Sequence, residues 1–99
     1  MSERFDADPN TLRLPSGRMF GAEPQKLHRQ IARFGISTVG MPPLLVTRGQ
    51  FGELLIIDGV TRATRVAKLL PGRQVPVEVL DEIPNWDLSI FPTVGERLP

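Results

Sequence analysis

The sequence predicts one small α/β domain spanning residues 1–99, an α+β arrangement with two main helices. Two segments space their apolar residues with the period of an amphipathic helix, and short apolar runs between and after them indicate a mixed sheet of about four strands. The length of 99 residues also suits one domain, because domains typically hold roughly 100–200 residues.

The two helices are predicted at residues 24–34 and 60–70. In the first, Leu27, Ile31 and Phe34 share one face, and Gly35 can supply a left-handed C-terminal stop. In the second, the small apolar residues gather on one face, whereas Arg62, Arg65 and Lys68 lie elsewhere and are expected to be solvated.

The strands are predicted from short runs of apolar or alternating residues. Residues 54–57, just before the second helix, form a continuous apolar run, which predicts a strand buried on both faces. Pro76 indicates an edge or strand-start position. The four predicted strands are residues 11–14, 44–47, 54–57 and 75–80.

Both ends of the chain lack such patterns. Residues 1–10 are polar and are expected to be loose. Residues 83–99 contain several prolines and predict an irregular tail, in which Trp86 and Phe91 are expected to cover the small core rather than to stack on nucleic-acid bases.

Composition excludes several functional classes. The chain has no cysteine, so disulfides, thiolate catalysis and cysteine-based metal sites are excluded, and the formal net charge of +1 neither favours nor opposes nucleic acid. The sequence shows neither a signal-peptide pattern nor an apolar run near the ~20 residues of a membrane span. These features predict a cytoplasmic protein without a membrane partner.

The candidate functional site is the turn between the third predicted strand and the second helix. Asp58 is expected to cap this helix, Gly59 allows a tight turn, and the first amides of the helix would attract an anion. Thr61 adds a hydroxyl and Arg62 a bidentate donor for phosphate, with Arg65 adjacent. Taken alone, the same residues also suit an ordinary cap, turn and solvated helix face.

A wider pattern resembles the N-terminal domain of the ParB partition-protein family, within the ParB/sulfiredoxin fold. In order, it comprises Phe34-Gly35, the Pro43-Leu44-Leu45-Val46 strand, the Asp58-Gly59-Val60-Thr61-Arg62 turn and the Val75-Pro76-Val77 strand. The resemblance implies a ParB-like domain. In that family the Gly-x-x-Arg turn contacts nucleotide phosphates, so the resemblance implies such contacts at Gly59 and Arg62, with Val60 and Thr61 between them. The predicted phosphate or nucleotide site also includes the adjacent Arg65.

The departures from that family concern catalysis. Partition proteins usually carry Gly-Glu-Arg-Arg, and sulfiredoxins Gly-Cys-His-Arg, whereas Val60 and Thr61 stand at the middle positions here. Sulfinic-acid repair is therefore not expected, because the reactive cysteine is missing. Asp58 is the one acid in the turn able to hold Mg²⁺ or orient a nucleophile, and no metal site is predicted elsewhere.

Three hypotheses follow. The first is a stand-alone ParB-like domain that binds a nucleotide, with or without Mg²⁺, or another phosphate at residues 59–62. The second is a non-catalytic module with a degenerate pocket that binds a larger protein or nucleic acid. The third is an enzyme, such as a ParB-like nuclease, NTPase or phosphotransferase, with Asp58 as its catalytic residue. The sequence favours the first over the second, and the enzyme least.

Overall fold

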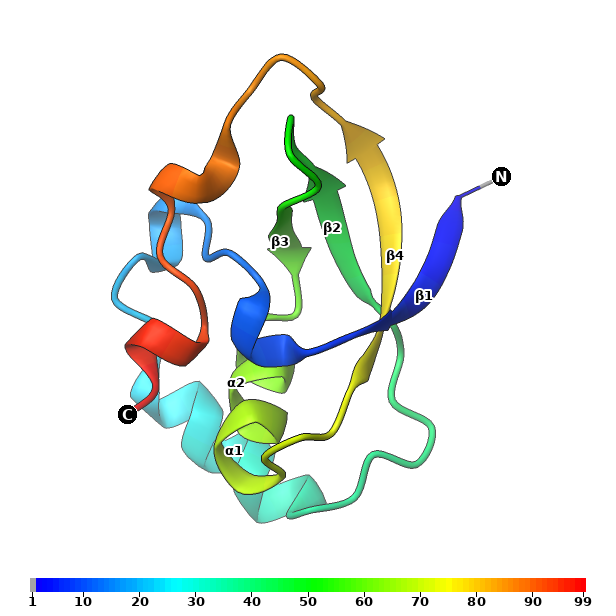
Figure 1. The fold of residues 1–99 in the computed structure, drawn as a ribbon. Coiled ribbons are helices and arrows are strands. Elements are labelled where there is room, and N and C mark those ends of the chain that lie inside the picture. The colour runs from blue at the N-terminus through cyan, green and yellow to red at the C-terminus, as the bar shows by residue number, and fades with distance from the viewer. Residues whose placement is uncertain (1) are drawn as a thin grey trace.

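A four-stranded sheet and two α-helices form the structure, a computed structural model that describes residues 2–99 (Figure 1). Strands β1 and β4 pair antiparallel, as do β2 and β3, whereas β2 and β4 run parallel, so the sheet is mixed, with the order β1-β4-β2-β3. The predicted fold class is confirmed. The elements are β1 (Glu3–Ala7), α1 (Pro24–Phe34), β2 (Leu44–Arg48), β3 (Leu54–Asp58), α2 (Val60–Leu69) and β4 (Val75–Glu82).

Both helices lie where their sequence patterns predict them. Helix α1 has the predicted bounds: its N-cap Glu23 accepts a hydrogen bond from the N–H of Gln25 at 3.1 Å, and Gly35 ends it with a φ of 54°. Helix α2 ends one residue before the predicted position. It provides the crossover that lets β4 run parallel to β2, because parallel strands require a long connection.

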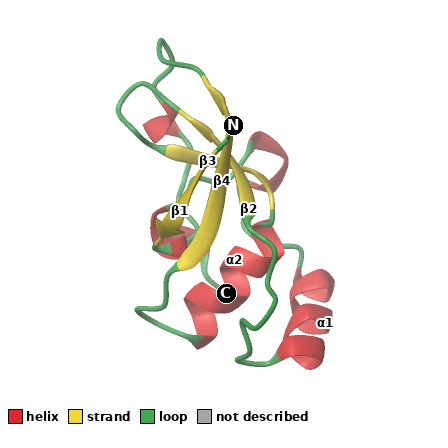
Figure 2. Ribbon diagram, turned by 90° about the vertical axis from the view of Figure 1, so that its right-hand side faces the viewer, coloured by secondary structure: helices red, strands yellow, loops and turns green. Residues whose placement is uncertain are grey.

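The core lies between the lower part of the sheet and α2 (Figure 2). Val46, Ile56 and Val77 of the sheet and Val66 of α2 are fully buried. Irregular segments complete this core. They contribute the fully buried Leu12 and Leu14 and the almost fully buried Val94, so a thin sheet-and-helix pair gains a third layer of apolar side chains.

The N-terminal predictions need correction. Residues 3–7 are not loose: they form β1, because the backbone of this polar segment pairs with β4. Residues 11–14 are not a strand. Thr11 is the last residue of a 3-10 turn, Pro9–Thr11, and of residues 11–14 only Arg13 makes isolated bridges, to Leu55 and Thr93.

Strand β3 is not buried on both faces. It is an edge strand of the sheet, where Ile56 is buried but Ile57 is 52% exposed. Its apolar run was misleading because solvent reaches one face of the sheet at this edge. Pro76 was predicted to lie either in an edge strand or at the start of a strand. It lies near the start of β4, which is an inner strand.

The tail has no strand or α-helix in residues 83–99, but two 3-10 turns fix it to the domain. Leu88 and Val94 are buried, and the N–H of Val94 donates to the carbonyl of Leu12 at 2.9 Å. Trp86 does not cover the core, since it is 67% exposed. No helix in residues 2–99 is long and apolar enough to cross a membrane.

An ion cluster joins β1 to the two inner strands. Arg48 lies 2.8 Å from a carboxylate oxygen of Glu3 and 2.7 Å from one of Glu82, and its hydrogen bond lowers the pKa of Glu3. Such a lowered pKa means that stability is present above the unfolded-state value and is lost as pH falls through the folded value.

We therefore expect the Glu3→Gln variant to lose less of its stability than wild type as pH falls through and below about 4.5, the ordinary value for Glu3. Urea unfolding of both proteins across that range measures the difference. In an Arg48→Met background, Glu3→Gln should no longer change the pH slope. If Glu3→Gln still changes the pH dependence of stability in that background, Arg48 is not the cause of the lowered pKa of Glu3.

Candidate functional site

The turn between β3 and α2 leaves the first amides of the helix unpaired. Gly59 is the N-cap residue, with a φ of 118°, and no side chain caps the helix. The first backbone bond is donated by Ala63 to the carbonyl of Gly59, at 2.9 Å, and within residues 2–99 the N–H groups of Val60, Thr61 and Arg62 have no acceptor. Such a helix end favours an anion.

Asp58 does not cap α2, contrary to the prediction. It precedes the N-cap residue, and its carboxylate instead lies 3.6 Å from Nη2 of Arg62. The prediction failed because the left-handed conformation of Gly59 makes Gly59 the N-cap and moves Asp58 one position outside the helix.

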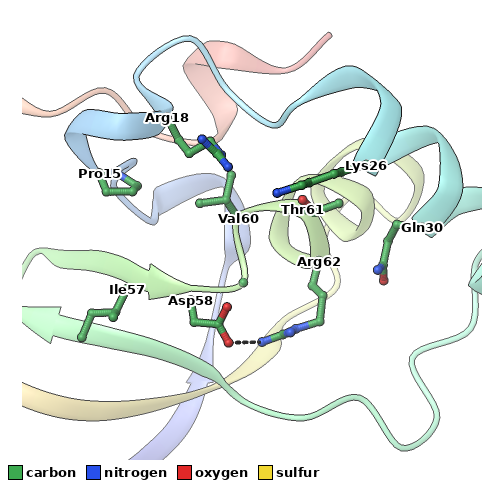
Figure 3. A pocket seen from close by; sticks show the side chains of 10 residues that line it. Pro15, Arg18, Lys26, Gln30, Ile57, Asp58, Val60, Thr61 and Arg62 are labelled. Atoms are coloured by element: carbon green, nitrogen blue, oxygen red, sulfur yellow. Dashed lines mark ion pairs between the residues drawn. The ribbon is translucent and has the colours of Figure 1, made fainter.

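A cavity of about 320 Å³ opens at this helix end (Figure 3). The structure places five of the predicted site residues on its wall: Asp58, Gly59, Val60, Thr61 and Arg62. Sequence reasoning missed most of the other wall. The remaining residues are Pro15, Arg18, Lys26, Gln30 and Ile57.

Three cations from separate elements surround the cavity. Arg18 comes from a 3-10 turn, Lys26 from α1 and Arg62 from α2. Figure 3 shows Arg18 and Lys26 reaching toward the first turn of α2 from two sides. Asp58 is the one carboxylate on this wall, so positive charge exceeds negative charge where the unpaired amides also favour an anion.

The guanidinium of Arg62 is only loosely held. Its Nη2 lies 3.5 Å from the carbonyl oxygen of Pro43 and 3.6 Å from the Asp58 carboxylate, both long for a hydrogen bond. Its Nε is buried and has no partner within the described part of the chain. Lys26 makes no hydrogen bond or ion pair with any of residues 2–99. Lys26 is therefore free to bind an incoming anion, and an anion can replace the two long Nη2 contacts of Arg62.

Arg65 does not belong to this cavity, although the sequence placed it in the site. It is 2% exposed, and its Nη1 donates to the carbonyls of Gly35 at 2.7 Å and Ser37 at 2.9 Å. Its guanidinium lies 5.5 Å from the ring centre of Phe34, and burial lowers its pKa. Arg65 thus fastens α2 to the end of α1.

The positive surface continues along α1. A second hollow adjoins the cavity and shares Lys26, Gln30 and Thr61 with it, and its other wall residues include Arg29 and Arg33. Lys68 lies at the far end of α2, where it donates to the carbonyl of Pro99 at 3.0 Å. The basic residues of the two helices therefore separate into three sets. Arg29 and Arg33 belong to the surface of α1, Arg62 lines the cavity, and Arg65 and Lys68 bond to backbone carbonyls elsewhere in the fold.

Within residues 2–99, no group of three or more histidine or carboxylate side chains is placed to hold a metal ion. Neither a comparison with protein-family models nor a search of curated proteins finds a match for this sequence.

Proposed function

We propose that this domain binds a phosphate group, carried by a nucleotide or another phosphorylated compound, at the N-terminus of α2. One observation carries the proposal: three cations from three elements line a cavity together with Val60, Thr61 and Arg62, whose backbone amides have no acceptor within residues 2–99. Phosphate suits such a site because it accepts several charge-assisted hydrogen bonds at once.

The resemblance of residues 59–62 to the ParB Gly-x-x-Arg turn supports phosphate over other anions. Thr61 brings a hydroxyl, and Arg62 a guanidinium whose two weak contacts a phosphate can replace. Val60 contributes its backbone amide but no reactive side chain. These residues favour binding over chemistry at the bound group.

The test is thermal unfolding of the whole chain in pyrophosphate, ATP, CTP and GTP, each with and without Mg²⁺. At a ligand concentration of 100 Kd, stabilisation by about 2.7 kcal/mol is expected. For a domain of this size, that corresponds to a rise of roughly 10–20 °C in Tm. If none of these compounds raises Tm, the phosphate proposal is wrong and the interaction-module hypothesis is favoured.

Lys26→Ala should weaken the binding of the most stabilising compound by at least about tenfold, since a hydrogen bond to a charged group contributes about 1.5–3 kcal/mol. Lys68→Ala is the matched control, because it removes a lysine from the opposite end of α2. Isothermal titration measures both affinities. Equal losses in the two variants would indicate a general charge effect and contradict a defined site.

Asp58→Asn separates binding from catalysis. Removing a carboxylate 3.6 Å from Arg62 should tighten phosphate binding by a few-fold, because Arg62 then has no competing anion. An enzyme that uses Asp58 would instead lose turnover. Phosphate release from ATP, CTP and GTP, or nicking of plasmid DNA, followed beside affinity in this variant, distinguishes the two: activity abolished by Asp58→Asn would establish the enzyme hypothesis.

A further inference from the structure

The two edges of the sheet differ in how they are covered. The edge at β3 is partly occupied by Arg13, whose N–H donates to the carbonyl of Leu54 at 2.8 Å and whose carbonyl accepts from Ile56 at 2.9 Å. The edge at β1 has no such cover: within residues 2–99, no element beyond β4 pairs with it, and Figure 1 shows β1 at the outer side of the domain. Free strand edges attract further strands.

Pro76 determines which groups of β1 point outward. Antiparallel partners alternate between hydrogen-bonded and non-hydrogen-bonded pairs, and Asp6 lies opposite Pro76. Since proline has no N–H, this ladder is intact only when Asp6–Pro76 is a non-hydrogen-bonded pair. The amide and carbonyl groups of Arg4 and Asp6 then point away from β4, toward the free edge.

Arg4 and Asp6 carry opposite charges and are separated by Phe5. We propose that β1 pairs antiparallel with β1 of a second copy about a two-fold axis through Phe5, which joins two sheets into one. In this register, Arg4 lies opposite Asp6 of the second copy, and each such pair brings together the outward backbone groups and two complementary charges. A two-fold interface of this kind is closed, because both copies use the same edge.

The side chains suit this register. Asp6 has no hydrogen bond or ion pair from its side chain within the described residues, so its carboxylate is available. Arg4 is 69% exposed and lies 2.8 Å from Glu78, on the flank opposite the incoming Asp6. Phe5, 37% exposed, would meet Phe5 of the second copy at the axis, where a non-hydrogen-bonded pair brings side chains closest.

The phosphate cavity is not required for this pairing. It lies at the β3 end of the sheet, and β1 forms the other edge, so the two cavities of a dimer would lie at its outer ends.

The test is sedimentation of the full chain from micromolar to millimolar concentration. We expect wild type to reach twice the 11.0 kDa mass of one chain. Asp6→Arg places two like-charged pairs at the interface and should weaken association by at least about tenfold. The swapped double variant Arg4→Glu with Asp6→Arg restores opposite charges and should associate again. Arg29→Glu reverses the charge of an exposed residue on α1, away from β1, and should leave association unchanged.

Circular dichroism of each variant first establishes that it is folded. A wild-type chain that stays at 11.0 kDa throughout overturns the proposal. So does a dimer that Asp6→Arg leaves intact, because the interface then lies elsewhere. A folded double variant that remains monomeric contradicts the register through Phe5. Phosphate affinity, measured in parallel, should not change with Asp6→Arg, which keeps this result separate from that of the cavity.

Discussion

Replacing Arg65 by alanine should lower the free energy of unfolding by about 3 kcal/mol. The side chain is buried, and it satisfies the carbonyls of Gly35 and Ser37, which follow the end of α1. A hydrogen bond from a charged group contributes about 1.5–3 kcal/mol, both of these bonds are partly buried, and the lost side-chain packing adds to the cost. Urea unfolding monitored by circular dichroism measures the change.

Arg65→Met separates the two contributions, because methionine fills part of the same space but donates no hydrogen bond. It should remain destabilising by about 2 kcal/mol if the two carbonyl bonds dominate. A loss below about 0.5 kcal/mol in the alanine variant is typical of a surface position and would mean that Arg65 does not hold the helices together.

Replacing Gly59 by alanine should destabilise the fold by about 2–6 kcal/mol and weaken phosphate binding at the same turn. The residue has a φ of 118°, which costs other residues about 1–3 kcal/mol. A Cβ there would also collide with the side chain of Leu44 in the core and come within 3.0 Å of Nη2 of Arg62. Overpacking of this kind typically adds about 1–3 kcal/mol.

Two other glycines provide matched controls. Gly52 also has a positive φ, 84°, but a Cβ there meets nothing within 4 Å, so Gly52→Ala reports backbone strain without crowding. Gly17→Ala has neither problem and should be close to neutral. If Gly59→Ala is no more destabilising than Gly52→Ala, contact with Leu44 is not the reason that glycine is required.

The sequence predicted an element correctly where the residues of that element alone determine its structure. Helix α1 was predicted to the residue because Pro24, an apolar stripe and Gly35 mark its start, face and end. Strand β1 was missed because its segment, Glu3–Ala7, is polar and becomes a strand only through pairing with β4, far along the chain. Secondary structure that depends on a distant partner leaves little local pattern.

The same distinction applies to the site. The turn at residues 59–62 was predicted because a glycine between a strand and a helix is a local signal. Arg18 and Lys26 were missed because tertiary folding alone brings them to that turn. Arg65 was expected beside the turn, but its side chain points to the end of α1, since a helical pattern does not tell which side of α2 faces α1.

The pairing of β1 with β4 also bears on the order of events during synthesis. Strand β1 emerges from the ribosome before the other three, yet its partner is the last of the four, so β1 must wait unpaired until nearly all of the sheet has been made. Leu12 and Leu14 also wait, because their backbone partners are Val94 and Pro92. Closing such long loops is entropically costly, so the domain should fold only after the residues up to Val94 have been made, rather than progressively from its N-terminal part.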